Sequence, residues 1–205
     1  MQAETYYHIY NHANESENLF KSTENYRFFL QQWAKYIEPV AETYAYCLMP
    51  NHFHALIRVY SDLEIANNLS LTNKDLTGFK NLSGLISKQF SNLFNSYTKA
   101  VNKQLDRQGS LFNRPFKSKE ITNNDYLTKV IHYLSVRKAG IHHNPIHHRF
   151  CKQYDDWPHS SYQAMISDAP TKLQRKEVIE WFGSTAAFKS FHQENIIYPD
   201  QIKLE

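Results

Sequence analysis

One stretch, residues 46–59, constrains the fold of this chain most. It reads Tyr-Cys-Leu-Met-Pro-Asn-His-Phe-His-Ala-Leu-Ile-Arg-Val, so two histidines flank a phenylalanine and lead into an apolar, β-favouring segment. Because side chains alternate between the two faces of a strand, we expect His52 and His54 to share one face while Phe53 enters the core. Two imidazoles side by side on a strand can hold a divalent metal ion, and a pair of surface histidines on a half-buried strand gives the same pattern.

The composition is that of an ordered globular protein with a sizeable core. The chain has 205 residues, of which 41% are hydrophobic and only five are glycine. A chain of this length fits one domain, or one domain with an extension. Its two cysteines, Cys47 and Cys151, form neither a disulfide framework nor a zinc-finger spacing. The first residues lack the features of a signal peptide, and no run of ~18 apolar residues occurs, so we expect a cytoplasmic protein without membrane spans.

The net charge of +3 is mild, but the positive charge is unevenly distributed. Between residues 99 and 119 the only acidic residue is Asp106, whereas six residues are basic: Lys99, Lys103, Arg107, Arg114, Lys117 and Lys119. Such a stripe suits a phosphate backbone, and a solvated surface explains it equally well.

Helical and strand patterns alternate along the chain. The predicted strands are 6–12, 43–48, 52–59 and 111–121, and the predicted helices begin near residues 22, 63, 82, 123 and 171 and after Gly183. The two strands joined by Met49-Pro50-Asn51 should be antiparallel neighbours. This order predicts an α+β fold of ferredoxin-like type, an antiparallel sheet with packed helices, followed by a C-terminal helical extension. We expect the α+β domain over residues 1–150 and the extension over residues 151–205.

Several of these motifs together resemble a known family. The segment 46–54 resembles the His-hydrophobic-His motif of the single-tyrosine HUH transposases, and 7–11 resembles the first strand of that family. The segments Gly109–Lys117, Asn144-Pro145 and 157–162 resemble its later landmarks, and the long tail is more similar to the REP-associated tyrosine transposases. The resemblance implies a metal-dependent DNA transposase that cleaves and rejoins single-stranded DNA beside a hairpin through a 5′-phosphotyrosine intermediate. The implied partner is single-stranded or hairpin DNA, and both a monomer and a homodimer remain open.

The resemblance also implies a set of site residues. His52, His54 and Asn144 correspond to the ligands of a divalent metal ion, Mg²⁺ or Mn²⁺. In the family the nucleophilic tyrosine lies four residues before the polar ligand, one helical turn away on the same face. That position here is Gly140, and Tyr133 is the best substitute as the catalytic nucleophile. Seven additional residues, 134–140, would move Tyr133 ~10 Å along a continuous helix.

Candidate DNA-binding residues are Arg114, Lys117 and Lys119 in the basic stripe, and Arg137, whose guanidinium could hold a phosphate.

Three other interpretations remain open. A transposase relative without catalytic activity would still bind DNA hairpins, which the glycine at position 140 favours. A two-histidine phosphoesterase acting on RNA ends needs a second His-x-Ser/Thr motif, for which His159-Ser160-Ser161 is a near match. The histidines between 142 and 148 would form a second metal site, although their doublets fit no common zinc spacing.

Overall fold

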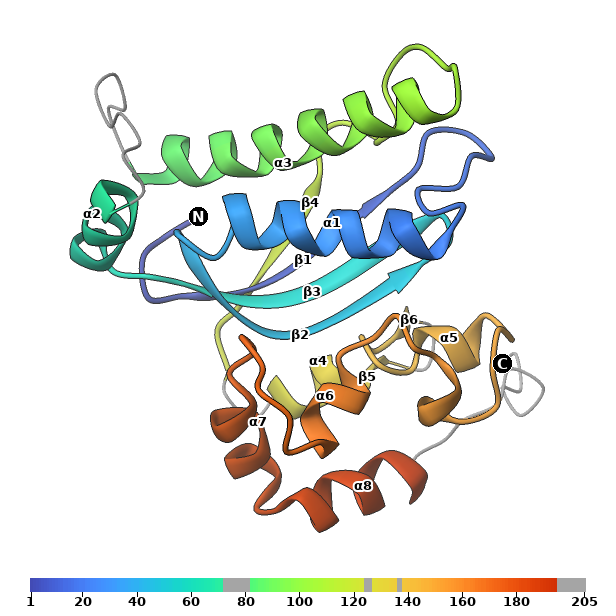
Figure 1. The fold of residues 1–205 in the computed structure, drawn as a ribbon. Coiled ribbons are helices and arrows are strands. Elements are labelled where there is room, and N and C mark those ends of the chain that lie inside the picture. Colours follow the sequence, from blue (N-terminus) through green and yellow to red (C-terminus); the bar gives the residue numbers. More distant parts are fainter. Residues whose placement is uncertain (72–81, 124–126, 136–137, 195–205) are drawn as a thin grey trace.

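The structure, a computed structural model, describes residues 1–71, 82–123, 127–135 and 138–194. Its centre is a four-stranded sheet with the strand order β2-β3-β1-β4, in which all neighbours are antiparallel. The strands are β1 (Tyr6–His12), β2 (Ala41–Met49), β3 (His52–Val59) and β4 (Lys117–Ile121). Helices α1 (Thr23–Tyr36) and α3 (Leu82–Gln104) both cover one face of the sheet (Figure 1). This is the predicted ferredoxin-like α+β arrangement. No helix in the described ranges is long and apolar enough to cross a membrane.

The core on this first face is built from aromatic side chains. Phe29 and Trp33 of α1 and Phe90 of α3 are buried around Phe53 of β3, which has no exposed surface. Ring pairs such as Phe29–Tyr97, at 5.2 Å and 89°, adopt the edge-to-face geometry that the ring quadrupoles favour. The apolar periodicity of both helices is therefore core packing against the sheet.

The opposite face carries the C-terminal half of the chain (Figure 1). It consists of helices α4 (Leu127–His132), α5 (Asn144–His147), α6 (Tyr162–Ile166), α7 (Arg175–Phe182) and α8 (Thr185–Glu194), the 3₁₀ turn η2 (Tyr154–Asp156), and the hairpin of β5 (Tyr133–Ser135) and β6 (Lys138–Ala139). Their apolar side chains pack on Tyr44, Met49 and Leu56 of the sheet. The remaining helix, α2 (Asp62–Leu71), follows β3.

Residues 157–161 run along the outer edge of β2. The backbone N–H of Leu48 donates to His159 O at 2.9 Å, and that of Ser161 donates to Tyr46 O at 2.9 Å. The indole Nε1 of Trp157 donates to Leu48 O at 3.1 Å. These bonds satisfy backbone groups that an open edge strand would expose, so the extension closes this edge of the sheet.

Three predicted elements are shorter than expected. The helix predicted from about residue 171 begins only at Arg175, because the residue before it bonds to the sheet instead: Gln174 N donates to Thr43 O at 3.0 Å. The strand predicted over 111–121 begins only at Lys117, because residues 111–113 bond instead to the segment that follows β1: Asn113 N donates to His12 O, and Asn14 N donates to Leu111 O, both at 2.9 Å. The helix predicted to run through residue 134 ends at His132, and Tyr133 begins a strand.

The early end of α4 has a clear cause in the backbone hydrogen bonds. A continuing helix would pair the carbonyls of Val130 and Ile131 with the amides of residues 134 and 135. Those carbonyls instead accept from Ile141 N at 3.0 Å and His142 N at 2.8 Å. After α4 the chain forms the antiparallel pair β5 and β6, and Ile141 and His142 then return to the end of α4.

Candidate functional site

Strand β3 places the two predicted histidines on the face of the sheet opposite Phe53. The ring centroids of His52 and His54 lie 5.2 Å apart with the ring planes at 86°. His52 is only 4% exposed and His54 is partly buried. Because both side chains arise from one hydrogen-bonded strand, their separation is set by the backbone rather than by a flexible loop.

Strand β1 adds two further histidines to the pair. The register opposes His12 to His52 and Tyr10 to His54. His8 Nε2 lies 2.9 Å from His54 Nδ1, and the His12 and His52 ring centroids lie 4.8 Å apart. Neither His8 nor His12 was predicted as a site residue, although their spacing of four residues in a strand puts both on one face.

Helix α5 supplies the third predicted ligand, Asn144. Its side chain is buried and hydrogen-bonded to His52, and its amide nitrogen donates to Gly140 O at 2.8 Å. His148, which follows α5, brings its ring centroid to 5.1 Å from that of His52. The structure therefore brings His52, His54 and Asn144 together from segments about ninety residues apart in the chain.

The return of the chain to α4 after β5 and β6 explains how Asn144 comes to lie beside His52. Ile141 and His142 bond to α4 as residues 134 and 135 would in a continuous helix, so the numbering is offset by seven. By the same offset, Asn144 occupies the position that residue 137 would have in a continuous helix. That position is one helical turn after residue 133, where the chain leaves α4. A continuous helix would instead have displaced Tyr133 and Asn144 along its axis.

The environment keeps both histidines of the pair neutral near pH 7. Burial, together with the neighbouring imidazoles of His12 and His148, lowers the pKa of His52 to about 3. Burial and the adjacent His8 and His52 hold the pKa of His54 well below its ordinary value. Neutral imidazole is the form that binds metal ions.

The donors present suit a divalent cation only with the asparagine included. In the ranges that the structure describes, no three His, Cys, Asp or Glu side chains are grouped so that they could hold a metal ion. Two imidazoles of one strand and one amide form a mixed nitrogen and oxygen donor set, which fits Mn²⁺ and, less strongly, Mg²⁺.

Of the other predicted site residues, two lie on the face of the sheet that carries the histidines and the others do not or lie outside the described residues. The backbone of Tyr133 pairs with Ala139 at the start of β5, and its side chain lies outside the described part of the structure, as does all of Arg137. Lys117 is opposite Tyr10, and Lys119 is opposite His8, so both exposed lysines project from the face that carries the histidines. Arg114 lies next to α3 instead.

The guanidinium of Arg114 donates to Asn95 Oδ1 at 3.4 Å. The two residues line a cavity of about 310 Å³ between α3 and residues 110–116.

Two histidines of the predicted second metal site, His142 and His143, bond to other side chains instead of forming that site. His142 and His143 are both 1% exposed and point into the core of the second face. His142 bonds to Ser161 Oγ at 2.7 Å and to His192 Nε2 at 3.1 Å, and His143 Nδ1 bonds to Tyr154 Oη at 3.0 Å. These contacts join α5, η2 and α8, so the histidines have a packing role there.

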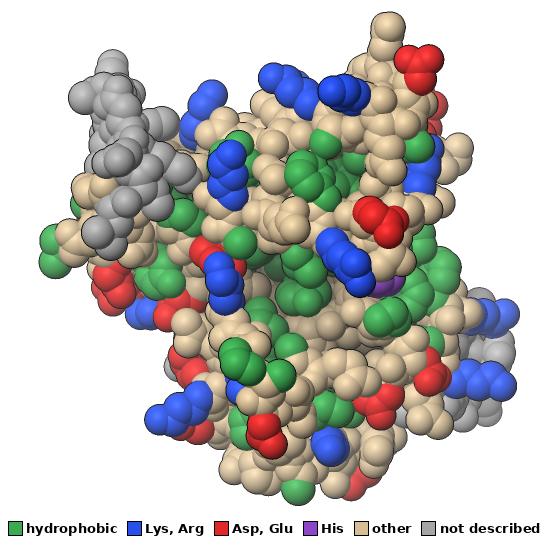
Figure 2. Space-filling model, in the orientation of Figure 1, with side chains coloured by type: hydrophobic (Ala, Val, Ile, Leu, Met, Phe, Trp, Pro, Cys, Tyr) green, Lys and Arg blue, Asp and Glu red, His purple; other side chains and the backbone are tan. Residues whose placement is uncertain are grey.

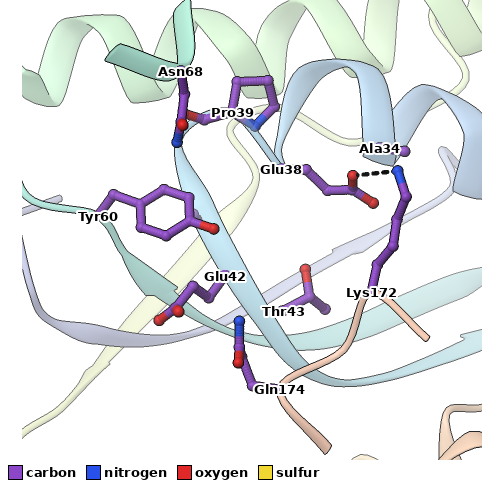
Figure 3. A pocket seen from close by; sticks show the side chains of 10 residues that line it. Ala34, Glu38, Pro39, Glu42, Thr43, Tyr60, Asn68, Lys172 and Gln174 are labelled. Atoms are coloured by element: carbon purple, nitrogen blue, oxygen red, sulfur yellow. Dashed lines mark hydrogen bonds and ion pairs between the residues drawn. The ribbon is translucent and has the colours of Figure 1, made fainter. Parts of the chain in front are cut away.

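Two larger grooves lie at the β2 edge, away from the histidines. One, of about 420 Å³, is lined by Glu42, Thr43 and Tyr60 and is bridged by Lys172 Nζ and Glu38 Oε2 at 2.7 Å (Figure 3). The other, of about 530 Å³, continues between α1 and residues 164–173. Figure 2 shows hydrophobic side chains along the boundary of the two layers, with Lys and Arg scattered over this face. Neither groove is lined by a histidine, so the histidine site is the better candidate for chemistry.

The fold and site together define a ferredoxin-like α+β protein with a pair of histidines on an inner strand. A solved structure of a REP-associated tyrosine transposase bound to a REP hairpin is similar to this chain, with a TM-score of 0.52 and 17% sequence identity. The match covers 82% of this chain and 84% of that chain. At this identity the likeness concerns the fold. No protein-family model matches the sequence, and no curated protein is similar to it.

Proposed function

We propose that this chain is a metal-dependent DNA transposase that cleaves and rejoins single-stranded, hairpin-flanked DNA through a 5′-phosphotyrosine intermediate. The observation that carries the proposal is the convergence of Asn144 on the pair His52 and His54, on the sheet face that also carries Lys117 and Lys119. The similarity in fold to a tyrosine transposase that binds a DNA hairpin supports the same class of substrate.

In this proposal His52, His54 and Asn144 hold the divalent ion. When bound, the ion neutralises charge that develops on the phosphodiester and thereby lowers the barrier to its cleavage. The low pKa values of the two histidines keep their lone pairs available at neutral pH.

Tyr133 is the proposed nucleophile. Its hydroxyl oxygen attacks the phosphorus and its proton is released, while the bond to the 3′ oxygen breaks and leaves a free 3′-OH. The phosphotyrosine ester retains the bond energy, so attack by a 3′-OH in the reverse direction rejoins the strand. The return of the chain to α4 supports this role, because it sets Asn144 in the register of a residue four positions after Tyr133.

The lysines of β4 give the DNA strand a path to the site. Across the sheet, His54, Tyr10 and Lys117 occupy one row, and neighbouring strands are about 4.8 Å apart. A phosphate near Lys117 would therefore lie about two strand spacings from His54. We propose that Lys117 and Lys119 bind the backbone of the strand whose next phosphate is cleaved.

The test is incubation of the protein with a hairpin-flanked single strand and Mn²⁺, followed by denaturing electrophoresis. The proposal expects a covalent protein–DNA adduct that Tyr133→Phe abolishes. Tyr10→Phe is the matched control. Tyr10 is a tyrosine of β1 whose ring centroid lies 5.6 Å from that of His54, so it tests whether another tyrosine beside the histidines is the nucleophile. An adduct lost in Tyr10→Phe and retained in Tyr133→Phe would transfer the nucleophile to β1.

A second candidate function is a hairpin-binding module without catalytic activity. It is favoured by Gly140, which occupies the position four residues before Asn144 where the resemblance expects the tyrosine. Specific hairpin binding in the same assay, with no cleavage in Mn²⁺ or Mg²⁺, would select this function.

A further inference from the structure

The two histidines of the pair are held in the same way, each through its Nδ1 atom. His52 Nδ1 lies 2.8 Å from Asn51 Oδ1. An amide oxygen only accepts hydrogen bonds, and neutral His52 donates from one ring nitrogen only, so His52 gives its proton to Asn51 from Nδ1 and meets the Asn144 side chain with the Nε2 lone pair. In the neutral ring the Nε2 lone pair of His52 is then the one directed at a ligand.

His54 has an equivalent partner from a distant part of the chain. Its Nδ1 lies 2.9 Å from His8 Nε2, and the two ring planes differ by only 20° with centroids 5.1 Å apart. Nearly coplanar rings with a short N···N distance are joined edge to edge by an N–H···N hydrogen bond. One of the two nitrogens therefore donates and the other accepts.

The direction of this bond decides whether His54 can bind a cation. If His8 Nε2 donated, neutral His54 would carry its own proton on Nε2 and would have no lone pair there. If His54 Nδ1 donates, its Nε2 is free, as in His52. His8 is 4% exposed and held within β1 between Leu56 of β3 and Lys119 of β4, so its ring is a fixed partner.

We infer that His8 is a positioning residue that accepts the Nδ1 proton of His54 and so directs His54 Nε2 to the metal ion, as Asn51 does for His52. This inference rests on the proposed function. Residues that orient metal ligands in this way change metal affinity about 10–100-fold when they are replaced.

The side-chain amides offer a matched pair of variants. In His8→Gln the amide can place an oxygen near the position of Nε2 and still accept from His54. In His8→Asn the amide is one carbon too short to reach it, although its polarity is the same. His159→Gln controls for loss of an imidazole outside the site, because the His159 ring stacks on Tyr26 at 3.6 Å and its backbone bonds to the outer edge of β2.

The first measurement is Mn²⁺ binding, followed by the EPR signal of the free ion, with circular dichroism to check the fold. We expect the Kd of His8→Gln and His159→Gln to stay within about threefold of wild type, and that of His8→Asn to rise about 10–100-fold. Equal Mn²⁺ affinity in His8→Asn and wild type would overturn this inference and leave the proposed metal site unaffected. Equal loss in His8→Gln and His8→Asn would also overturn it, because the acceptor would then not matter.

The second measurement uses the metal-free wild type and needs no variant to fold. Ring ¹⁵N chemical shifts should show His54 protonated on Nδ1, and a proton on Nε2 would overturn the inference. Failure of wild type to bind Mn²⁺, with no further change in His52→Ala, would instead refute the proposed metal site itself and the inference with it.

Discussion

Lowering the pH from 7.5 to 5.5 should destabilise the folded protein, and His52 should account for a definable part of that loss. Burial and the neighbouring imidazoles lower the pKa of His52 from 6.5 to about 3 in the folded state. Below pH 6.5 the unfolded chain therefore binds a proton at this residue that the folded chain does not bind. The stability that His52 contributes is complete above pH 6.5 and is lost as the pH falls toward 3.

The size of the effect follows from the same two values. Each pH unit between them changes the free energy of unfolding by at most ~1.4 kcal/mol for one histidine. Because half of the interval from 7.5 to 5.5 lies above the unfolded pKa, we expect His52 to contribute a loss of about 1.4 kcal/mol over it.

The assay is urea unfolding with EDTA present at pH 7.5, 6.5 and 5.5, for wild type and His52→Gln. The variant has no titrating group at this position, so its free energy of unfolding should fall by about 1.4 kcal/mol less than that of wild type between the two end points. Parallel pH dependence in the two proteins would refute the argument that His52 is held neutral in the fold.

Other substitutions test the packing and the DNA path. Phe53→Ala should cost about 3–5 kcal/mol in urea unfolding, because it empties a fully buried site among aromatic rings; a loss below 1 kcal/mol would contradict that packing. Gly183→Ala should cost about 1 kcal/mol through backbone strain alone, since φ is +88° and an added Cβ meets no atom within 4 Å. The double variant Lys117→Ala, Lys119→Ala should lower the slope of log K against log salt by about 1.4 for a single strand, measured by fluorescence anisotropy. The control Lys88→Ala, on the exposed side of α3, should leave that slope unchanged, and an equal reduction there would argue against a path over β4.

Local sequence rules predicted the parts of this structure that depend on periodicity. Strand alternation predicted that Phe53 enters the core and that His52 and His54 share the other face. Helical spacing located α1 and α3, and the order of elements predicted the ferredoxin-like sheet. In each case neighbouring residues carry the information, because burial repeats at a fixed interval along the element.

The features that were missed depend on contacts between distant segments. The end of α4 is determined by the amides of Ile141 and His142, which take the carbonyls that a longer helix would use. Similarly, His8 reaches the site only through the pairing of β1 with β3, which the residues around His8 do not encode. A motif such as His-Phe-His indicates where a site begins, whereas its supporting residues become visible only with the strand register.

The most direct test of the central claim is mass spectrometry of the protein after reaction with a hairpin-flanked DNA strand in Mn²⁺. The account predicts a tyrosyl-linked 5′-phosphate on the peptide that contains Tyr133, formed in wild type and absent both in His52→Ala and when EDTA replaces the metal ion. A DNA strand cleaved without any tyrosine adduct, or an adduct that forms equally in EDTA and in His52→Ala, would contradict it.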